Sequence, residues 1–185
     1  MKISDILQQN NNQLNEAMTK NSIEIYIDMD EVVADFKGYA HMVLRGEKIE
    51  NGYRFPEHQW ERLKDNPRMY RDLPLKDGAN ELVEWCKSYC DEHNGKLSFL
   101  TAMPRKGDVW YAFYDKVHWA DNNFPDIPVF FGPKSEDKQN YCKGNNSILI
   151  DDRADNCKRW RDAGGRAHQY KNWEECQAWL IKELT

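Results

Sequence analysis

Two aspartates, Asp28 and Asp30, stand one residue apart at the end of the apolar run "IEIYI" (23–27). In an extended chain, side chains two residues apart point to the same side, so both carboxyl groups are expected to lie together. Carboxylates at that separation repel each other unless a cation or a shared proton relieves the repulsion. The pair therefore indicates a cation site, acid–base chemistry, or both.

A second acidic cluster follows another apolar run, in "ILIDDRAD" (148–155), and contains Asp151, Asp152 and Asp155. If the two runs are neighbouring strands of a parallel sheet, they deliver both clusters to the same edge. Mg²⁺ is the natural partner of such a group, because it prefers hard oxygen ligands and leaves coordination positions for phosphate oxygens. The alternative is that each cluster only caps a helix. We favour the metal site because both clusters follow β-like runs.

Between these clusters lie residues suited to holding a phosphoryl group. Thr101 follows the run "LSFL" (97–100), where its hydroxyl and the next backbone N–H groups, beginning with Ala102, can bind a phosphoryl oxygen. A lysine near the metal site would neutralise phosphoryl charge, and "GPKSEDKQNYCKG" offers three candidates, Lys134, Lys138 and Lys143. The alternative is that Thr101 only stabilises a turn and that each lysine is simply solvated.

The elements that must position these residues alternate along the chain. Apolar runs at 23–27, 97–100, 127–131, 147–150 and, more weakly, 166–170 are separated by helix-like segments at 78–93, 107–122, 135–143, 154–164 and 172–184. In the first of these segments, Leu82, Trp85, Cys86 and Tyr89 recur at helical spacing. This order predicts an α/β, Rossmann-like fold with a mostly parallel five-stranded sheet.

One connection, between Asp30 and Gly78, is too long to be a structureless loop. We predict that residues 37–75 form a small helical cap, inserted after the first strand of a core comprising 23–36 and 76–185. Ligands of parallel sheets bind beyond the carboxyl ends of the strands, so this cap is placed to act as a lid. Residues 1–22 form a polar extension, in which Ser4 caps a short helix or the chain is a mobile tail.

Composition sets limits on the class of protein. A chain of 185 residues suits one domain with a modest insertion, and its net charge of −5 disfavours a binder of long nucleic acid. The five cysteines include no CxxC pair and no histidine cluster accompanies them, so reduced thiols are expected rather than zinc. No signal-peptide core or membrane-length apolar run is present, which favours a cytoplasmic protein.

Taken together, "DMDEVVADF", "LTAMP", a lysine of "EDKQNYCKG" and "ILIDDRAD" resemble the four motifs of haloacid dehalogenase (HAD) superfamily phosphohydrolases, from about residue 23 to 170. Within that superfamily the chain is most similar to 5'(3')-deoxyribonucleotidases. Two departures stand out: Glu31 replaces a glycine common in that group, and Ala102-Met103 stands where a serine is often found. The resemblance implies the α/β core and the helical cap.

The resemblance also implies roles. Asp28 would be the nucleophile that forms an aspartyl-phosphate, and Asp30 would be the acid and base, protonated when substrate binds. Mg²⁺ would bind the Asp28 carboxylate, the Asp30 carbonyl and Asp152, with Asp151 in support. On the substrate side, Thr101 and a lysine would hold the phosphoryl oxygens, and Phe36 would lie against the sugar or base. We favour Lys138 over Lys134 as that lysine, and Trp60 is a weaker aromatic candidate.

The implied activity is Mg²⁺-dependent dephosphorylation of (deoxy)ribonucleoside monophosphates. Alternatives are a HAD phosphatase for another small phosphate ester or a polynucleotide end, a metal-dependent nuclease or nucleotidyl-transfer domain, and a non-catalytic binding module. The sequence leaves open the base, the 5' or 3' position of the phosphate, and whether the chain forms a homodimer.

Overall fold

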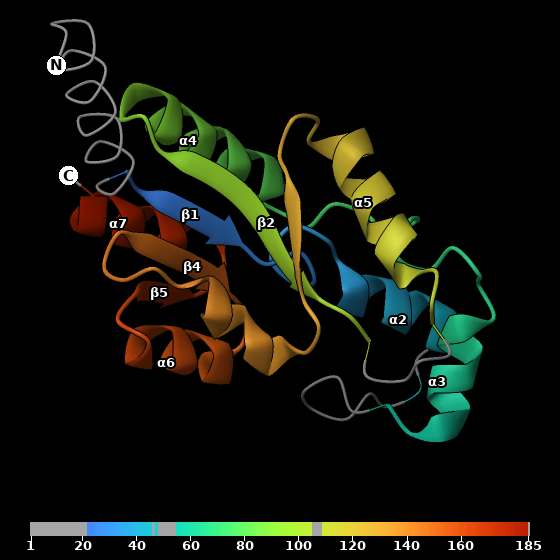
Figure 1. Ribbon diagram of the computed structural model, residues 1–185. Helices are drawn as coiled ribbons and strands as arrows, with labels where there is room; N and C mark the ends of the chain where they lie inside the picture. The colour runs from blue at the N-terminus through green and yellow to red at the C-terminus, as the bar shows by residue number, and fades with distance from the viewer. Residues whose placement is uncertain (1–21, 46, 48–54, 105–108, 185) are drawn as a thin grey trace, which may run out of the picture.

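The computed structural model describes residues 22–45, 47, 55–104 and 109–184 (Figure 1). Its strands are β1 (Glu24–Ile27), β2 (Lys96–Ala102), β3 (Val129–Gly132), β4 (Ser147–Asp151) and β5 (Arg166–Gln169). Its helices are α2 (Phe36–Leu44), α3 (Glu57–Lys64), α4 (Ala79–Glu92), α5 (Ala112–Asn123), the 3-10 helix η1 (Ser135–Tyr141), α6 (Ala154–Asp162) and α7 (Trp173–Leu184). None of these described helices is both long and apolar enough to cross a membrane.

The five strands form one parallel sheet in the order β3-β2-β1-β4-β5. In its register, Ile27 of β1 lies opposite Phe99 of β2 on one side and Ile150 of β4 on the other. The prediction of a five-stranded, mostly parallel sheet is therefore confirmed. Because β1 and β4 are neighbours, the two acidic clusters that follow them meet at one sheet edge.

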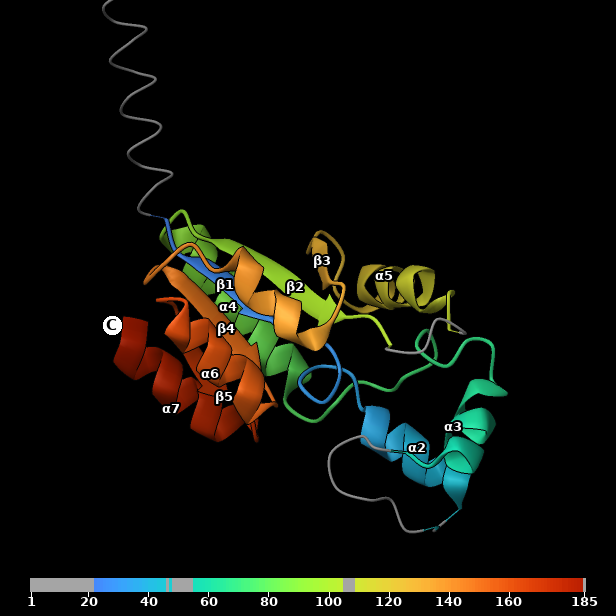
Figure 2. The ribbon, with the colours of Figure 1, turned by 60° about the horizontal axis from the view of Figure 1, so that its bottom comes forward.

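Helices cover both faces of the sheet. Successive side chains of β1 point to opposite faces, so they contact different helices. Ile25 and Ile27 are fully buried in the larger core, which also contains residues of α4 and α7. Tyr26 points to the opposite face, where its ring meets Trp160 of α6 edge-on at 5.3 Å. The sheet is thus the middle of three layers (Figures 1 and 2).

Helices α2 and α3, in the region of the predicted cap, lie beyond the carboxyl ends of the strands (Figure 2). The chain leaves and re-enters the core along two segments that pair with each other: Asp35 N–H donates to the Pro74 carbonyl, and Lys76 N–H to the Val33 carbonyl, each at 2.9 Å. Helices therefore occupy part of the predicted cap. Its boundaries stay a prediction. The predicted N-terminal extension up to residue 21, with Ser4, lies outside the described residues.

Candidate active site

The chain turns sharply directly after β1. The Met29 carbonyl accepts hydrogen bonds from the N–H groups of residues 32, 33 and 34, at 3.3, 3.0 and 2.9 Å. Glu31 within this turn has a φ of 65°, a left-handed conformation that a glycine adopts more easily. Asp28 N–H still donates to the Ile150 carbonyl at 2.9 Å, so Asp28 remains attached to β4. This turn presents Asp28 and Asp30 at the sheet edge.

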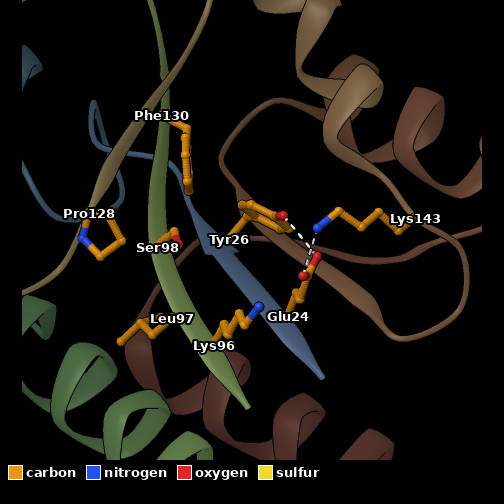
Figure 3. Close-up of a pocket in the computed structure, with 8 residues that line it drawn as sticks. All are labelled: Glu24, Tyr26, Lys96, Leu97, Ser98, Pro128, Phe130 and Lys143. Atoms are coloured by element: carbon orange, nitrogen blue, oxygen red, sulfur yellow. Dashed lines mark hydrogen bonds and ion pairs between the residues drawn. The ribbon is translucent and has the colours of Figure 1, made fainter. Parts of the chain in front are cut away.

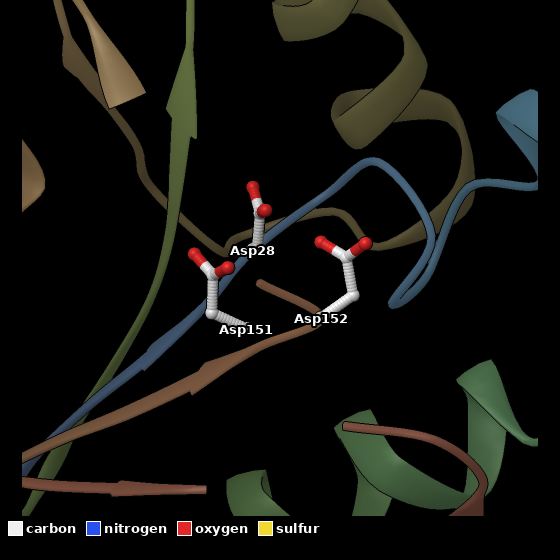
Figure 4. A group of neighbouring side chains, drawn as sticks. All are labelled: Asp28, Asp151 and Asp152. Carbon is white, nitrogen blue, oxygen red and sulfur yellow. The ribbon is translucent and has the colours of Figure 1, made fainter. Parts of the chain in front are cut away.

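Three of the predicted carboxylates meet at that edge. One oxygen from each of Asp28, Asp151 and Asp152 lies within 4.8 Å of the others (Figure 4). Asp28 is 5% exposed and Asp151 is fully buried. Asp155, in contrast, is exposed in the first turn of α6 and does not belong to this cluster.

Lys138 joins the two strand ends. Its ammonium lies 2.7 Å from Asp28 Oδ1 and 2.7 Å from Asp151 Oδ2. Although burial opposes the charge, Asp151 and Asp28 raise the pKa of Lys138, which remains a cation. Gly132 makes the approach possible, because a Cβ there would lie 2.9 Å from the Lys134 carbonyl and 3.2 Å from Lys138 N. Of the two predicted alternatives, Lys138 lies at the acidic cluster, whereas Lys134 is exposed.

Asp151 is held rigidly by the protein. Its Oδ1 accepts from Arg153 N–H at 2.9 Å, and the Asn156 side-chain amide lies 3.0 Å from both of its oxygens. Lys138 adds its bond to Oδ2. Because both oxygens already accept hydrogen bonds, Asp151 is better suited to orienting Lys138 than to binding a metal ion.

Two carboxyl groups of the cluster, those of Asp28 and Asp152, are electrostatically destabilised as anions. Burial raises the pKa of Asp28 well above its usual range, with Asp151 and Asp152 adding to the shift and Lys138 opposing it. Burial likewise raises the pKa of Asp152 to about 7, and Asp151 adds to that effect. A divalent cation would stabilise both charged forms, and the carboxylates of Asp28 and Asp152 are the hard oxygen donors that Mg²⁺ prefers. The residues present therefore fit that ion.

Asp30 has a different partner, Lys116 of α5, which the sequence analysis missed. The Lys116 ammonium lies 2.6 Å from Asp30 Oδ2 and 2.8 Å from Thr101 Oγ1. Thr101 is fully buried, and its hydroxyl oxygen accepts the hydrogen bond from Lys116. Ala102, the last residue of β2, is half-buried beside it.

A sequence signal for Lys116 did exist. On α5, the buried residues Ala112, Lys116, Trp119 and Ala120 lie at i, i+4, i+7 and i+8, which is one face of a helix. A lysine in an apolar stripe must have a buried partner, since an unpaired buried charge is costly. The stripe does not reveal which partner, because that depends on where the helix packs.

The aromatic residues predicted to contact the sugar or base, Phe36 and Trp60, belong to a cluster of aromatic rings. Phe36 is 3% exposed, and its ring centroid lies 5.9 Å from those of both Tyr70 and Phe55. Trp60 stacks on Phe55 at 6.4 Å. The Phe36 ring is thus buried among other rings in this structure rather than presented to solvent.

A cavity of about 320 Å³ lies elsewhere, toward the amino ends of β1 and β2 (Figure 3). Lys143, the third predicted lysine, is found there and pairs with Glu24 at 2.8 Å, while Tyr26 donates to the same carboxylate at 3.0 Å. No residue of the acidic cluster lines this cavity. Lys143 is therefore separate from the candidate active site.

Comparison with known proteins identifies solved structures that share this fold. No protein-family model and no curated protein matches the chain. A solved hydrolase from Streptococcus pneumoniae TIGR4 matches with a TM-score of 0.53 at 15% identity, over 86% of this chain and 98% of that one. YfnB of Bacillus subtilis, described as a HAD-hydrolase and bound to magnesium, matches with a TM-score of 0.53 at 13% identity. The match covers 79% of this chain and 85% of YfnB. At these identities the likeness establishes a shared fold.

Proposed function

We propose that this chain is a Mg²⁺-dependent phosphomonoesterase of the HAD type, which dephosphorylates (deoxy)ribonucleoside monophosphates through an aspartyl-phosphate on Asp28. The observation that carries the proposal is the cluster of buried Asp28, buried Asp151 and half-buried Asp152, in which Lys138 joins the first two at the carboxyl edge of the sheet. The magnesium bound to the similarly folded YfnB supports the choice of metal.

Charge balance gives independent support for a divalent cation. Asp28, Asp30, Asp151 and Asp152 contribute four carboxylates, and the ammonium groups of Lys116 and Lys138 offset two of them. Counted with all four carboxylates ionised, the remaining formal charge of −2 is what one Mg²⁺ neutralises. The Asp28 carboxylate, the Asp30 carbonyl and Asp152 would hold the ion, with Asp151 orienting Lys138. When bound, Mg²⁺ would withdraw charge from the phosphoryl oxygens and make phosphorus more electrophilic.

The residues then divide the chemistry between them. A carboxylate oxygen of Asp28 attacks phosphorus, the bond from phosphorus to the nucleoside oxygen breaks, and Asp30 donates its proton to that leaving oxygen. In the second step a water attacks the aspartyl-phosphate while Asp30 takes one of its protons. The bond between phosphorus and Asp28 breaks, which releases phosphate and restores both carboxyl groups. Lys138 stabilises the charge that develops on the phosphoryl oxygens.

The nucleotide assignment rests on the aromatic cluster and on the end of β2. The backbone N–H groups that follow Thr101, beginning with Ala102, would bind phosphoryl oxygens, since the Thr101 hydroxyl already contacts Lys116. Phe36, with Trp60 as a second ring, would lie against the sugar or base. Because Phe36 is 3% exposed, this contact requires the cap to move away from the core. Stacking on aromatic rings is a common way to bind a nucleobase.

The decisive test is the variant Asp28→Asn, assayed for phosphate release from a panel of nucleoside monophosphates, sugar phosphates and p-nitrophenyl phosphate. We expect a loss of more than about 10³-fold in kcat with the fold retained. The matched control is Asp162→Asn, a 59% exposed carboxylate on α6, which should keep normal turnover. Near-normal turnover of Asp28→Asn would show that Asp28 is not the nucleophile.

Trapping with beryllium fluoride and Mg²⁺ tests the covalent step separately. The proposal requires an adduct on Asp28 that mimics the aspartyl-phosphate, detected in a crystal structure or by ¹⁹F NMR. A nuclease or nucleotidyl-transfer domain that activates water would form no such adduct. Its absence, together with cleavage of phosphodiesters, would favour that class instead.

A further inference from the structure

We infer that Lys116 is a positioning residue for Asp30, and that it determines which of the two Asp30 oxygens exchanges the proton. This inference rests on the proposed function, in which Asp30 is the acid and base. It concerns a residue that lies outside the four motifs on which the sequence resemblance is based.

The two oxygens of Asp30 have different surroundings. Oδ2 lies 2.6 Å from the Lys116 ammonium. Within the described part of the chain, Oδ1 is shielded from solvent and has no hydrogen-bond partner. Because Lys116 occupies Oδ2, Oδ1 is left to give a proton to the leaving group and to receive one from water, once the proposed movement of the cap away from the core admits them.

Lys116 also connects Asp30 to the end of β2. The same ammonium donates to Thr101 Oγ1 at 2.8 Å, so a lone pair of that hydroxyl is used and its own hydrogen must point elsewhere. Thr101 precedes Ala102, whose backbone N–H is proposed to bind a phosphoryl oxygen. A single cation therefore fixes the acid relative to the place where the phosphoryl group binds.

A third contact relates Lys116 to the cap. The ammonium lies 4.8 Å from the ring centroid of Tyr70, a distance typical of a cation–π contact. Tyr70 in turn stacks on Phe36 of α2, with ring planes inclined by 20°. Lys116 thus lies where β1, β2, α5 and the segment leading back from the cap converge, and the position of the cap affects it through Tyr70.

Fold stability alone does not explain a lysine here. Lys116 is 1% exposed and shares its helix face with Ala112, Trp119 and Ala120. Burying an ion pair often costs as much as it returns, and apolar residues of similar volume commonly stabilise a fold as well or better. The charge is therefore best explained by the chemistry of Asp30.

The expected catalytic effect follows from the change in charge at Asp30. When Asp30 gives its proton to the leaving oxygen it becomes a carboxylate, and the adjacent ammonium stabilises that carboxylate. This stabilisation grows as the proton leaves, so it lowers the barrier rather than strengthening substrate binding. It should matter most for a poor leaving group such as a nucleoside hydroxyl, and little for p-nitrophenolate, which needs no proton.

The test compares Lys116→Met, which removes the charge, with Lys116→Gln, which keeps a neutral donor. For a nucleoside monophosphate we expect kcat to fall about 10²-fold in Lys116→Met and less in Lys116→Gln, within the range for general acid catalysis. For p-nitrophenyl phosphate the loss in kcat/KM, which excludes hydrolysis of the aspartyl-phosphate common to both substrates, should stay below about fivefold, with KM for the nucleotide little changed. Lys158→Met, a change at a 71% exposed lysine on α6, is the matched control.

Two further measurements separate this inference from the proposed function. Binding of beryllium fluoride with Mg²⁺ should survive in Lys116→Met, which shows that Asp28 and the metal site are intact. In a crystal structure of the variant, the Asp30 carboxylate should be displaced from its wild-type position. Equal losses on both substrates, or an Asp30 that does not move, would overturn the role of Lys116 while leaving the phosphatase assignment untouched. A wild-type protein that hydrolyses neither substrate would instead overturn the proposed function.

Discussion

Asp152 provides a quantitative test of the metal site through stability rather than activity. Burial raises the pKa of Asp152 to about 7, compared with 3.8 for an unperturbed aspartate. The folded state therefore holds this proton more tightly than the unfolded state does. Without metal, the contribution of Asp152 to stability is most favourable below about pH 4 and is lost as the pH rises from about 4 to about 7.

The structure also sets the size of this effect. A difference of about three pKa units corresponds to about 4 kcal/mol, which we reduce to roughly 2–4 kcal/mol because the side chain is partly exposed. In metal-free protein near pH 8, Asp152→Asn should raise the free energy of unfolding by that amount. For a chain of this size the corresponding rise in Tm is on the order of 5–10 °C. Near pH 5 the increase in the free energy of unfolding should be less than half as large.

Magnesium should reverse the order of the two proteins. Near pH 8, Mg²⁺ stabilises the wild type by binding its ionised carboxylates, whereas Asp152→Asn has lost one of the proposed ligands. The assay is thermal unfolding in EDTA and in Mg²⁺ at both pH values, with Asp162→Asn as the control. The reasoning is refuted if Asp152→Asn is no more stable than the wild type in EDTA near pH 8. An equal rise in Tm with Mg²⁺ for both proteins would also refute it.

Three further substitutions probe the supports of the site. Lys138→Met removes the cation between two buried carboxylates, so activity should be lost and denaturant unfolding should show a cost of roughly 3–5 kcal/mol. Unchanged stability would contradict this. Gly132→Ala places a Cβ 2.9 Å from the Lys134 carbonyl and pushes the η1 turn away from β3, so kcat should fall about tenfold and Tm should fall as well. Normal kcat would show that the close approach is unnecessary. Glu31→Gly relaxes a φ of 65° but removes a carboxylate 3.3 Å from Lys76 and 2.7 Å from Lys37 N. Hydrogen exchange in α2 should therefore accelerate, and slower or equal exchange would argue against Glu31 as a link between cap and core.

Much of the architecture was predictable because it depends on patterns that are local in sequence. Short apolar runs separated by amphipathic segments lead to parallel strands with helical crossovers, and the observed sheet agrees with all five predicted strands. The acidic pairs could be located for the same reason, since each directly follows a strand. A parallel sheet aligns the carboxyl ends of its strands, so Asp28 and Asp152 had to meet once β1 and β4 were neighbours.

The sequence by itself therefore determined which strand ends carry acidic residues and which loop carries a lysine near them. Only the tertiary structure decided how those charges pair. Asp28 shares Lys138 with Asp151, while Asp30 is paired with Lys116, a residue 86 positions away along the chain. That pairing depends on how α5 is rotated and packed against the rest of the protein, which is settled by side-chain volumes from several segments at once. A periodic pattern identifies the buried face of a helix, but the partner of that face is a property of the whole fold.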